Sequence, residues 1–577
     1  MRRIPSVSQS LCFNKKIIHA VWAVTGLAAA SGLTAGCRAT GPAAEVGAEA
    51  GELADVTTRP AGSSLPRTAA EFFAPKTFYY VRVTGWDPSR LSPDDLRDDI
   101  ATEGARLSVF RADPNSRTHC PDAAATDAER LLDTAAFTME MSGNMTFGTP
   151  KAFYRMKLRG SDNRLLGLRT VNLKSMWNDV SQMRESLSWD FFKHAGVSAS
   201  ARHTYAKLCI NGRYYGLYSF IEMVDKSFVA QHWPRQQKGN LYKAGMIPRD
   251  IGSATLERRQ GADGDDSGRQ YFRTTDLGER TYELKTNDDP EDAVFQTYDD
   301  LAILARTLAG TGLPGTGDAR FRTREFEQSI EAIFDVKTFL RWAGANVLLG
   351  GWDNYWKNPN NYYLYNSGQS DNGDGFLQRP YFTWVPHDYD NSFGLAYDNI
   401  LWHESDLVDW ERGKGSAAQR PGRGNAALPA LTNLLKNRKY LRYYLDHVEY
   451  LLGTWFNARM LEPRIYGPDG LARFLRESVI LESSGTECPR NGNDRDDEQE
   501  IDQCRVHTFR QYTWFEVKHF GFGNNKLVRG NMTSEGLGFY IRLREASARR
   551  QLAVLRARHP RGSSGVTFPD ASPNRFN

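Results

Sequence analysis

Several signatures of common protein classes are missing from this chain. Its 577 residues carry a net charge of only +4, from 73 basic and 69 acidic residues, so charge alone does not favour nucleic acid or a membrane surface as a partner. None of the six cysteines has the paired spacing of a zinc site. Neither a GxxxxGKS/T motif nor a GxSxG motif occurs. These absences remove the usual sequence evidence for a P-loop, a zinc centre or an α/β-hydrolase.

The composition is that of a folded globular protein. Hydrophobic residues make up 40% and charged residues 25% of the chain, and aromatic residues reach 12%. A chain of this length can form several domains or one large two-lobed enzyme with a substantial core. Disorder is therefore not expected for most of the sequence.

The first 37 residues have the pattern of an export signal. Basic residues precede an uncharged apolar run, IIHAVWAVTGLAAASGL, which closes with LTAGC. This ending resembles a bacterial lipobox, in which Cys37 would be acylated, although Thr34 stands where leucine is usual. A lipoprotein, a cleaved secreted protein and a retained anchor all stay open, because the run is near the lower length limit for crossing a bilayer. We expect an exported protein, in the cell envelope or secreted, that meets the membrane only through its N-terminus.

Two cysteines near the C-terminus flank a polar loop. Cys488 and Cys504 bound the segment CPRNGNDRDDEQEIDQC, which a disulfide could close in an oxidising compartment, with two ordinary thiols as the alternative. The acidic tract within this segment, residues 493–502, lacks the alternating donors and central glycine of an EF-hand loop. It is interpreted as a solvated loop.

Composition and periodicity predict an α+β fold in five parts. They are the signal (1–37), a flexible linker (38–70), a smaller β-rich lobe with extra N-terminal strands (71–245), a larger, mainly helical lobe (246–560) and a tail (561–577). Within the first lobe, alternating aromatic and β-branched residues predict strands over 77–86, 153–160 and 170–175.

Capping and turn residues place further elements in the first lobe. A helix through residues 183–195 should be capped by Asp179 and end at Gly196. The dipeptide Asn211-Gly212 tolerates the positive φ angles of a tight turn and predicts a hairpin between two apolar runs.

The second lobe is mainly helical, with two interruptions. Helices are expected over residues 336–351, capped by Asp335, and over 431–456. The strand-like interruptions are GWDNYWKNPNNYYLYN (351–366) and PYFTWVPHDYDNSFG (380–394).

These interruptions carry the residues best suited to chemistry. Asp353 follows a long helix, and Asp388 and Asp390 follow an apolar strand. Carboxylate and amide oxygens hold Mg²⁺ on phosphates, and one carboxylate orients an acceptor hydroxyl, so both segments supply donors suited to phosphoryl transfer. Structural interpretations stay open, because Asp353 could cap a turn and the other two could form Asx turns or a Ca²⁺ site. The nearby asparagines are turn formers by default: Asn358, Asn360 and Asn361.

A series of motifs runs through the chain in a fixed order. They are LRGSDN (158–163), MRESL (183–187), HAGV (194–197), NGRYYGLYSFIEMVDKSF (211–228), GNLYKA (239–244), YELKTN (282–287), WDNYWKNPNNYYLY (352–365) and HDYDNSFG (387–394). In this order they resemble the CotH kinase family of spore-coat proteins. The resemblance implies an atypical protein-kinase fold with a smaller β-rich N-lobe and a larger helical C-lobe. It also implies phosphorylation of Ser-rich protein partners with ATP and a divalent metal, Mg²⁺ or Mn²⁺.

The resemblance assigns roles to the acidic and amide residues. Asp353 matches the Asp that orients the acceptor hydroxyl, and Asp388 and Asp390 match a pair of which at least one binds metal. Asn361 stands directly before YYLY, as the metal-binding Asn does in the family, whereas Asn358 has the usual spacing from Asp353. Both asparagines stay open as the metal ligand.

The nucleotide-binding residues are less well determined. Lys174 is the candidate phosphate-binding lysine and would pair with Glu185, while the stretch around Glu222 resembles a hinge beside the nucleotide base. Arg159 and Arg164 compete with Lys174, because the family's usual Lys-Lys-x-Tyr stretch is missing. A solvated lysine at a strand end and an exposed helix glutamate are the structural alternatives for Lys174 and Glu185.

Three functions follow from these patterns. The first is an exported kinase that phosphorylates Ser or Thr of an envelope or extracellular protein. The alternative is a non-catalytic, kinase-like scaffold that organises surface proteins. A third possibility is a metal-dependent hydrolase or a transferase that uses another nucleotide.

Overall fold

The computed structural model describes most of the chain between residues 65 and 561 as an α+β protein. The described residues are 65–86, 100–102, 104–120, 129–142, 151–176, 179, 181–245, 254–272, 280–357, 359–397, 402–408, 428–485, 522–524 and 532–561. The predicted export signal, the tail from residue 562 and both cysteines of the predicted C-terminal disulfide lie outside them. Among the helices of these ranges, none combines the length and the apolar character that crossing a bilayer requires.

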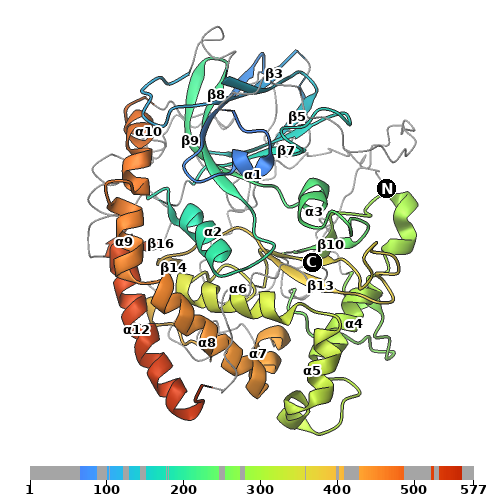
Figure 1. Cartoon of the computed structure of the whole chain (residues 1–577). Helices are drawn as coiled ribbons and strands as arrows, with labels where there is room; N and C mark the ends of the chain where they lie inside the picture. The colour runs from blue at the N-terminus through green and yellow to red at the C-terminus, as the bar shows by residue number, and fades with distance from the viewer. Residues whose placement is uncertain are drawn as a thin grey trace, which may run out of the picture.

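A mixed sheet of nine strands forms one end of the molecule (Figure 1). Neighbouring strands are antiparallel except β1 and β8, which are parallel. In spatial order the strands are β2 (Ile100–Ala101), β5 (Phe137–Ser142), β6 (Phe153–Leu158), β7 (Thr170–Lys174), β9 (Arg213–Ile221), β8 (His203–Ile210), β1 (Phe78–Thr84), β3 (Arg106–Arg111) and β4 (Arg130–Thr134). The three strands expected in the first lobe are β1, β6 and β7, so these predictions are confirmed.

Strands β8 and β9 form the predicted hairpin. Ile210 pairs with Arg213, and the two turn residues between them, Asn211 and Gly212, have φ angles of +50° and +78°. Asparagine and glycine are the residues that adopt this conformation most readily, so the turn chemistry is sufficient to fix the hairpin.

Two smaller sheets lie among the helices. The four-stranded sheet contains β11 (Tyr282–Leu284), β10 (Asn240–Ala244), β12 (Tyr362–Asn366) and β13 (Phe382–Pro386), and the three-stranded sheet contains β14 (Leu395–Tyr397), β16 (Met532–Glu535) and β15 (Phe522–Asn524). β12 and β13 arise from the two predicted interruptions and pair antiparallel, with Tyr362 opposite Pro386. The start of β12 therefore lies beside the end of β13.

Helices form the other end of the molecule and flank the sheets (Figure 1). The α-helices are α1 (Ala69–Phe72), α2 (Arg184–His194), α3 (Lys226–His232), α4 (Asp299–Leu308), α5 (Arg324–Glu331), α6 (Val336–Leu349), α7 (Pro429–Lys436), α8 (Arg438–Thr454), α9 (Ala458–Tyr466), α10 (Leu471–Gly485) and α12 (Leu537–Arg558). Short 3₁₀ helices are η4 (Gly268–Gln270), η5 (Pro290–Phe295), η6 (Gly317–Arg322) and η7 (Trp402–Glu404).

Of the two helices predicted in the second lobe, one is confirmed and the other is corrected. Asp335 caps α6 as expected, because its side chain accepts the backbone N–H of Thr338 at 3.0 Å. The single helix expected over residues 431–456 is wrong. Asn437 has an extended backbone and its side chain accepts the N–H of Lys439 at 2.9 Å, so it ends α7 and caps α8. Asparagine's preference for capping outweighs the continuous apolar periodicity.

Apolar side chains cover both faces of the large sheet. One face packs with α1 in a core that includes Phe72, Val81 and Val171. The other face contributes to a larger core, in which residues of α2 pack together with those of α6, α8 and the four-stranded sheet. α2 is therefore the buried helix that joins the large sheet to the helical part of the molecule.

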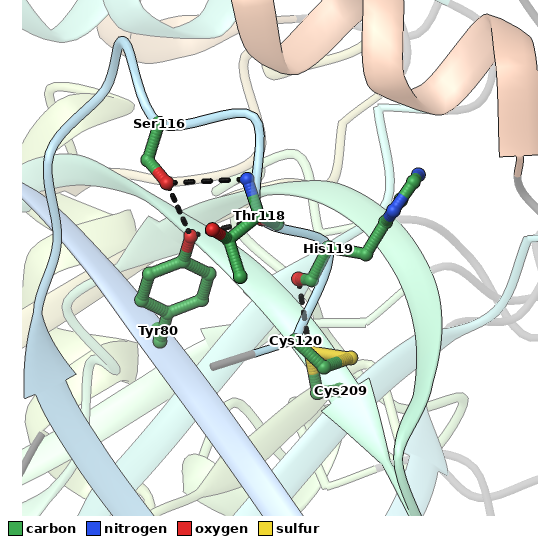
Figure 2. The surroundings of a disulfide bond; sticks show 6 residues. All are labelled: Tyr80, Ser116, Thr118, His119, Cys120 and Cys209. Carbon is green, nitrogen blue, oxygen red and sulfur yellow. Dashed lines mark hydrogen bonds between the residues drawn. A yellow bond between two sulfur atoms is a disulfide. The ribbon is translucent and has the colours of Figure 1, made fainter. Parts of the chain in front are cut away.

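A disulfide joins Cys120 to Cys209 (Figure 2). Cys209 lies in β8, and Cys120 lies in the segment that follows β3, 89 residues earlier in sequence. The hydroxyl of Tyr80 donates to the carbonyl oxygen of Thr118 at 3.0 Å, which holds the same segment against β1. Because the two cysteines are far apart in sequence, local patterns do not predict this disulfide.

Candidate functional site

Lys174 is the centre of a buried group of charges. Its ammonium contacts Oε1 of Glu185 at 2.9 Å and also Oδ1 of Asp388. The side chains of Lys174, Glu185 and Asp388 are 8%, 2% and 29% exposed. A solvated lysine at a strand end and an exposed helix glutamate are therefore the wrong interpretations of Lys174 and Glu185.

Three separate elements bring these side chains together. Lys174 is the last residue of β7, Glu185 lies in the first turn of α2, and Asp388 follows β13. Lys174 and Asp388 are 214 residues apart in sequence. The group thus joins the nine-stranded sheet to the four-stranded sheet.

The start of α2 differs from the expected one. The helix begins at Arg184, its N-cap is Met183, and Gln182 has a φ of +55°. Asp179 is therefore not the cap residue, but it still accepts the backbone N–H of Arg184 at 2.8 Å and pairs with the Arg184 guanidinium. The acidic residue stabilises the helix start across a tight turn that the sequence pattern did not predict.

The start of β12 and the end of β13 lie side by side. The backbone N–H of His387 donates to the carbonyl of Asn361 at 3.1 Å. Asn361 and Asp388 have φ angles of +53° and +59°, a left-handed conformation that asparagine and aspartate tolerate better than other residues with a Cβ. The chain therefore turns away from both strands at the same edge of the sheet.

Two amides connect Asp353 to this edge. Nδ2 of Asn361 donates to the backbone carbonyl of Asp353 at 2.8 Å. Nδ2 of Asn391 donates to Oδ2 of Asp353 at 3.3 Å and to Oδ1 of Asp390 at 3.0 Å. One amide can make both bonds because it carries two hydrogens. Asp353, Asn361, Asp388 and Asp390 are therefore gathered at one place in the fold.

The charges of the group shift one another's protonation. Burial lowers the pKa of Lys174, but attraction by Asp388, Glu185 and Asp390 outweighs burial and raises it above its ordinary value. Burial favours a protonated Asp388, yet the adjacent Lys174 holds the pKa of that carboxyl below its ordinary value. Burial and repulsion by Asp388 raise the pKa of Asp390 well above the usual range. A further negative charge is therefore disfavoured at Asp390.

The available donors suit a hard divalent cation. The Asp388 and Asp390 carboxylates and the amide oxygen of Asn361 are the kind of ligand that Mg²⁺ and Mn²⁺ take, and a cation would relieve the repulsion that acts on Asp390. No three His, Cys, Asp or Glu side chains in the described part of the chain form a complete metal cluster.

The other basic candidates for a phosphate site lie at the far end of β6. Lys157 pairs with Thr170 near that end, whereas Lys174 is at the opposite end of β7. Arg159 is exposed in the turn after β6, and Arg164 donates to the carbonyl of Asn163 in the same turn at 2.8 Å. Of the three basic candidates, Lys174 is the one in the charged group.

Glu222 follows β9 and is buried. Its carboxylate accepts Nε of Arg202 at 2.9 Å and lies 3.6 Å from Nε2 of His232. Burial raises its pKa, but hydrogen bonds from His232 and Arg202 outweigh burial and lower it. Because this network occupies the carboxylate, a nucleotide at the expected hinge would have to contact backbone groups.

The three asparagines predicted near Asp353 differ in their contacts. Asn358 lies outside the described residues, Asn360 is buried, and Asn361 is the one that touches Asp353. Asn391 is a functional candidate that the sequence did not distinguish from other turn asparagines. Its position directly after the Asp-x-Asp pair is the signal that could have found it.

Comparison with known proteins agrees with the motifs. Residues 139–500, more than half of the chain, match the family model described as CotH kinase protein. The chain is also similar to the inner spore coat protein H of Bacillus subtilis (strain 168), with 25% identity over 332 residues, which is 55% of this chain and 75% of that protein. The whole charged group lies within the family match.

Proposed function

Because this chain belongs to the CotH kinase family, we propose that it transfers the γ-phosphate of ATP to Ser or Thr hydroxyls of an envelope or extracellular protein. The observation that carries this proposal is the buried contact of Lys174 with both Glu185 and Asp388. Phosphoryl transfer needs a cation beside the phosphates, oxygen donors for metal and a carboxylate at the acceptor hydroxyl. The charged group and the adjoining Asp353 contain all three.

The order of elements supports a two-lobed, kinase-like fold. In protein kinases the phosphate-binding lysine is on the third strand of the N-lobe and pairs with a glutamate of the helix αC. Here β5, β6 and β7 are consecutive neighbours in the sheet, Lys174 ends the third of them, and Glu185 lies in α2, the next helix. We therefore propose that the nine-stranded sheet and α2 form the smaller lobe.

Each side chain then has a distinct role. Lys174 binds phosphate oxygens and is held in place by Glu185. Asp353 orients the acceptor hydroxyl and receives its proton, and Asn391 fixes the Asp353 carboxylate. Asp388, Asp390 and the amide oxygen of Asn361 would hold Mg²⁺ or Mn²⁺, which offsets the charge of the phosphates when bound.

The protein's location is proposed to be outside the cytoplasm. Disulfides persist in oxidising compartments, and Cys120 and Cys209 form one here. The name of the similar protein, inner spore coat protein H, refers to the spore coat. Both observations support the export predicted from the N-terminus, and acylation at Cys37 remains part of the proposal.

A phosphotransfer assay tests the proposal. The chain from residue 38 onward, incubated with Mg²⁺, labelled ATP and a Ser-rich protein, should transfer phosphate. Asp353→Asn should lower the rate by about 10²- to 10⁴-fold and leave ATP affinity unchanged, because the carboxylate acts on the acceptor. Asp371→Asn, which changes an exposed aspartate between β12 and β13, is the matched control and should remain active. A chain that neither binds ATP nor transfers phosphate would refute the proposal.

The alternative is a non-catalytic scaffold, and one observation favours it. The ammonium of Lys174 contacts Asp388, a carboxylate that the kinase proposal assigns to metal. A scaffold would bind its partner equally well as wild type and as Asp353→Asn, with no phosphate transferred by either. The same assay therefore separates the two functions.

A further inference from the structure

The four-stranded sheet presents a polar patch beside Asp388. Lys243 of β10 pairs directly with Tyr363 of β12, so both side chains lie on one face of the sheet. The Tyr363 ring lies 5.1 Å from the ring of His387, the residue before Asp388. Leu241 and Val385 share this face and pack toward α3 and the end of β9.

The nine-stranded sheet faces this patch with Arg155. Arg155 pairs with Asn172 on β7, two residues before Lys174, so Arg155 and Lys174 lie on the same face of their sheet. Arg155 interacts electrostatically with Lys243 and Tyr363. Residues from both sheets therefore converge beside the Lys174 group.

The patch contains hydrogen-bond donors that lack acceptors. The Lys243 ammonium makes no hydrogen bond or ion pair with any residue in the described ranges. The Tyr363 hydroxyl is buried without a partner there, and so is Nε of Arg155, whose Nη1 donates to Glu140. Unpaired buried donors are costly, so the two at Tyr363 and Arg155, beside the half-buried ammonium of Lys243, indicate a ligand rich in acceptor oxygens.

The charge of the Lys174 group points to the same ligand. Lys174 is already balanced by two carboxylates and offers no surplus positive charge to a triphosphate. Lys243 is half-buried, and burial together with Lys285 lowers its pKa to about 8, a shift that an anion would reverse.

We propose that Lys243, Tyr363 and Arg155 form a second anion site that receives phosphate oxygens of the nucleotide, across from Lys174. This inference rests on the proposed ATP-dependent function, and it identifies Lys243 as a second phosphate-binding lysine. The site adjoins the residue before Asp388, so phosphates held near Lys174 and Asp388 lie within its neighbourhood.

Binding measurements on the full chain test the proposal. Wild type and Lys243→Met are titrated with Mg²⁺-ATP and with adenosine, which has no phosphate. ATP affinity should fall about tenfold or more in Lys243→Met, as expected for the loss of a charge-assisted hydrogen bond, while adenosine affinity stays unchanged. Lys285→Met is the matched control, because Lys285 is on the same face but pairs with Glu283 at 2.5 Å, and both affinities should be retained.

Each other result has a defined meaning. If Lys243→Met keeps wild-type ATP affinity, the anion site is overturned and the proposed function stays intact. If the KM for the acceptor protein rises at the same time, Lys243 binds the acceptor and not the nucleotide. An equal loss of affinity for adenosine and for ATP overturns the proposed phosphate contact. A wild-type chain that binds no ATP overturns the proposed function itself.

Discussion

Replacing Lys174 with methionine should destabilise the fold, because it leaves buried carboxylates without their cation. Glu185 is 2% exposed and loses its 2.9 Å partner, while Asp388 is 29% exposed and can be partly solvated. Breaking a buried ion pair by removing one partner costs about 3–5 kcal/mol. Because Asp388 keeps access to water, we expect the lower end, about 3 kcal/mol at neutral pH.

The loss should depend on pH in a defined direction. Burial already raises the pKa of Glu185, and removal of Lys174 takes away the attraction that opposes this rise. A carboxyl whose pKa is higher in the folded than in the unfolded state binds more protons when folded, so the free energy of unfolding falls as pH rises above about 4. The deficit of Lys174→Met relative to wild type should therefore be larger at pH 7.5 than at pH 5.

Urea denaturation of the purified chain at both pH values measures this deficit. Lys285→Met is the matched control, because Lys285 and Glu283 are 30% and 45% exposed, and such a pair contributes about 0–1 kcal/mol. Equal losses for the two variants, with no change between pH 5 and pH 7.5, would show that Lys174 does not neutralise a buried charged group. The reasoning behind the site would then fail.

Three further predictions concern other parts of the structure. Cys120→Ser should lower the free energy of unfolding by about 2–5 kcal/mol, and a reducing agent should lower the melting temperature of wild type more than that of this variant; equal sensitivity would contradict the pairing with Cys209. Burial lowers the pKa of His447 to about 3, so the imidazole stays neutral in the folded protein. The unfolded chain binds this proton below about pH 6.5, so the free energy of unfolding falls as pH drops below that value. His447→Phe should remove about 2 kcal/mol of the loss between pH 6.5 and pH 5, and an unchanged pH profile in urea denaturation would contradict this. Asn391→Leu should lower kcat of phosphotransfer with ATP affinity retained, because its amide positions the Asp353 carboxylate; a normal kcat would remove that role.

Local chemistry predicts some elements of this fold and misplaces others. The hairpin at Asn211-Gly212 is predicted because two adjacent residues determine it. The cap of α2 is misplaced because Gln182 adopts a positive φ, which a capping pattern does not reveal. The break at Asn437 is missed because apolar periodicity continues through it, although its side chain satisfies the N-terminal N–H groups of α8.

Long-range pairings are the part that local patterns cannot supply. The contact between Lys174 and Asp388 spans 214 residues, and the disulfide spans 89. Each depends on how β7, β8 and β13 are placed by the sheets. The motifs supply candidate residues, whereas the contact of Asn391 with Asp353 and the pairing of Lys243 with Tyr363 are seen only in the fold.

The turn and ligand interpretations of the key residues are compatible with each other. Asn361 and Asp388 were open to explanation as turn formers, and both indeed adopt the left-handed backbone of a turn residue. That conformation carries a modest cost for a residue with a Cβ, and short polar side chains reduce it. The same turns bring Asp388 to Lys174 and Asn361 to Asp353. The residue directly before β12 and the residue that follows the end of β13 are therefore also the proposed metal ligands, because one backbone conformation serves both purposes.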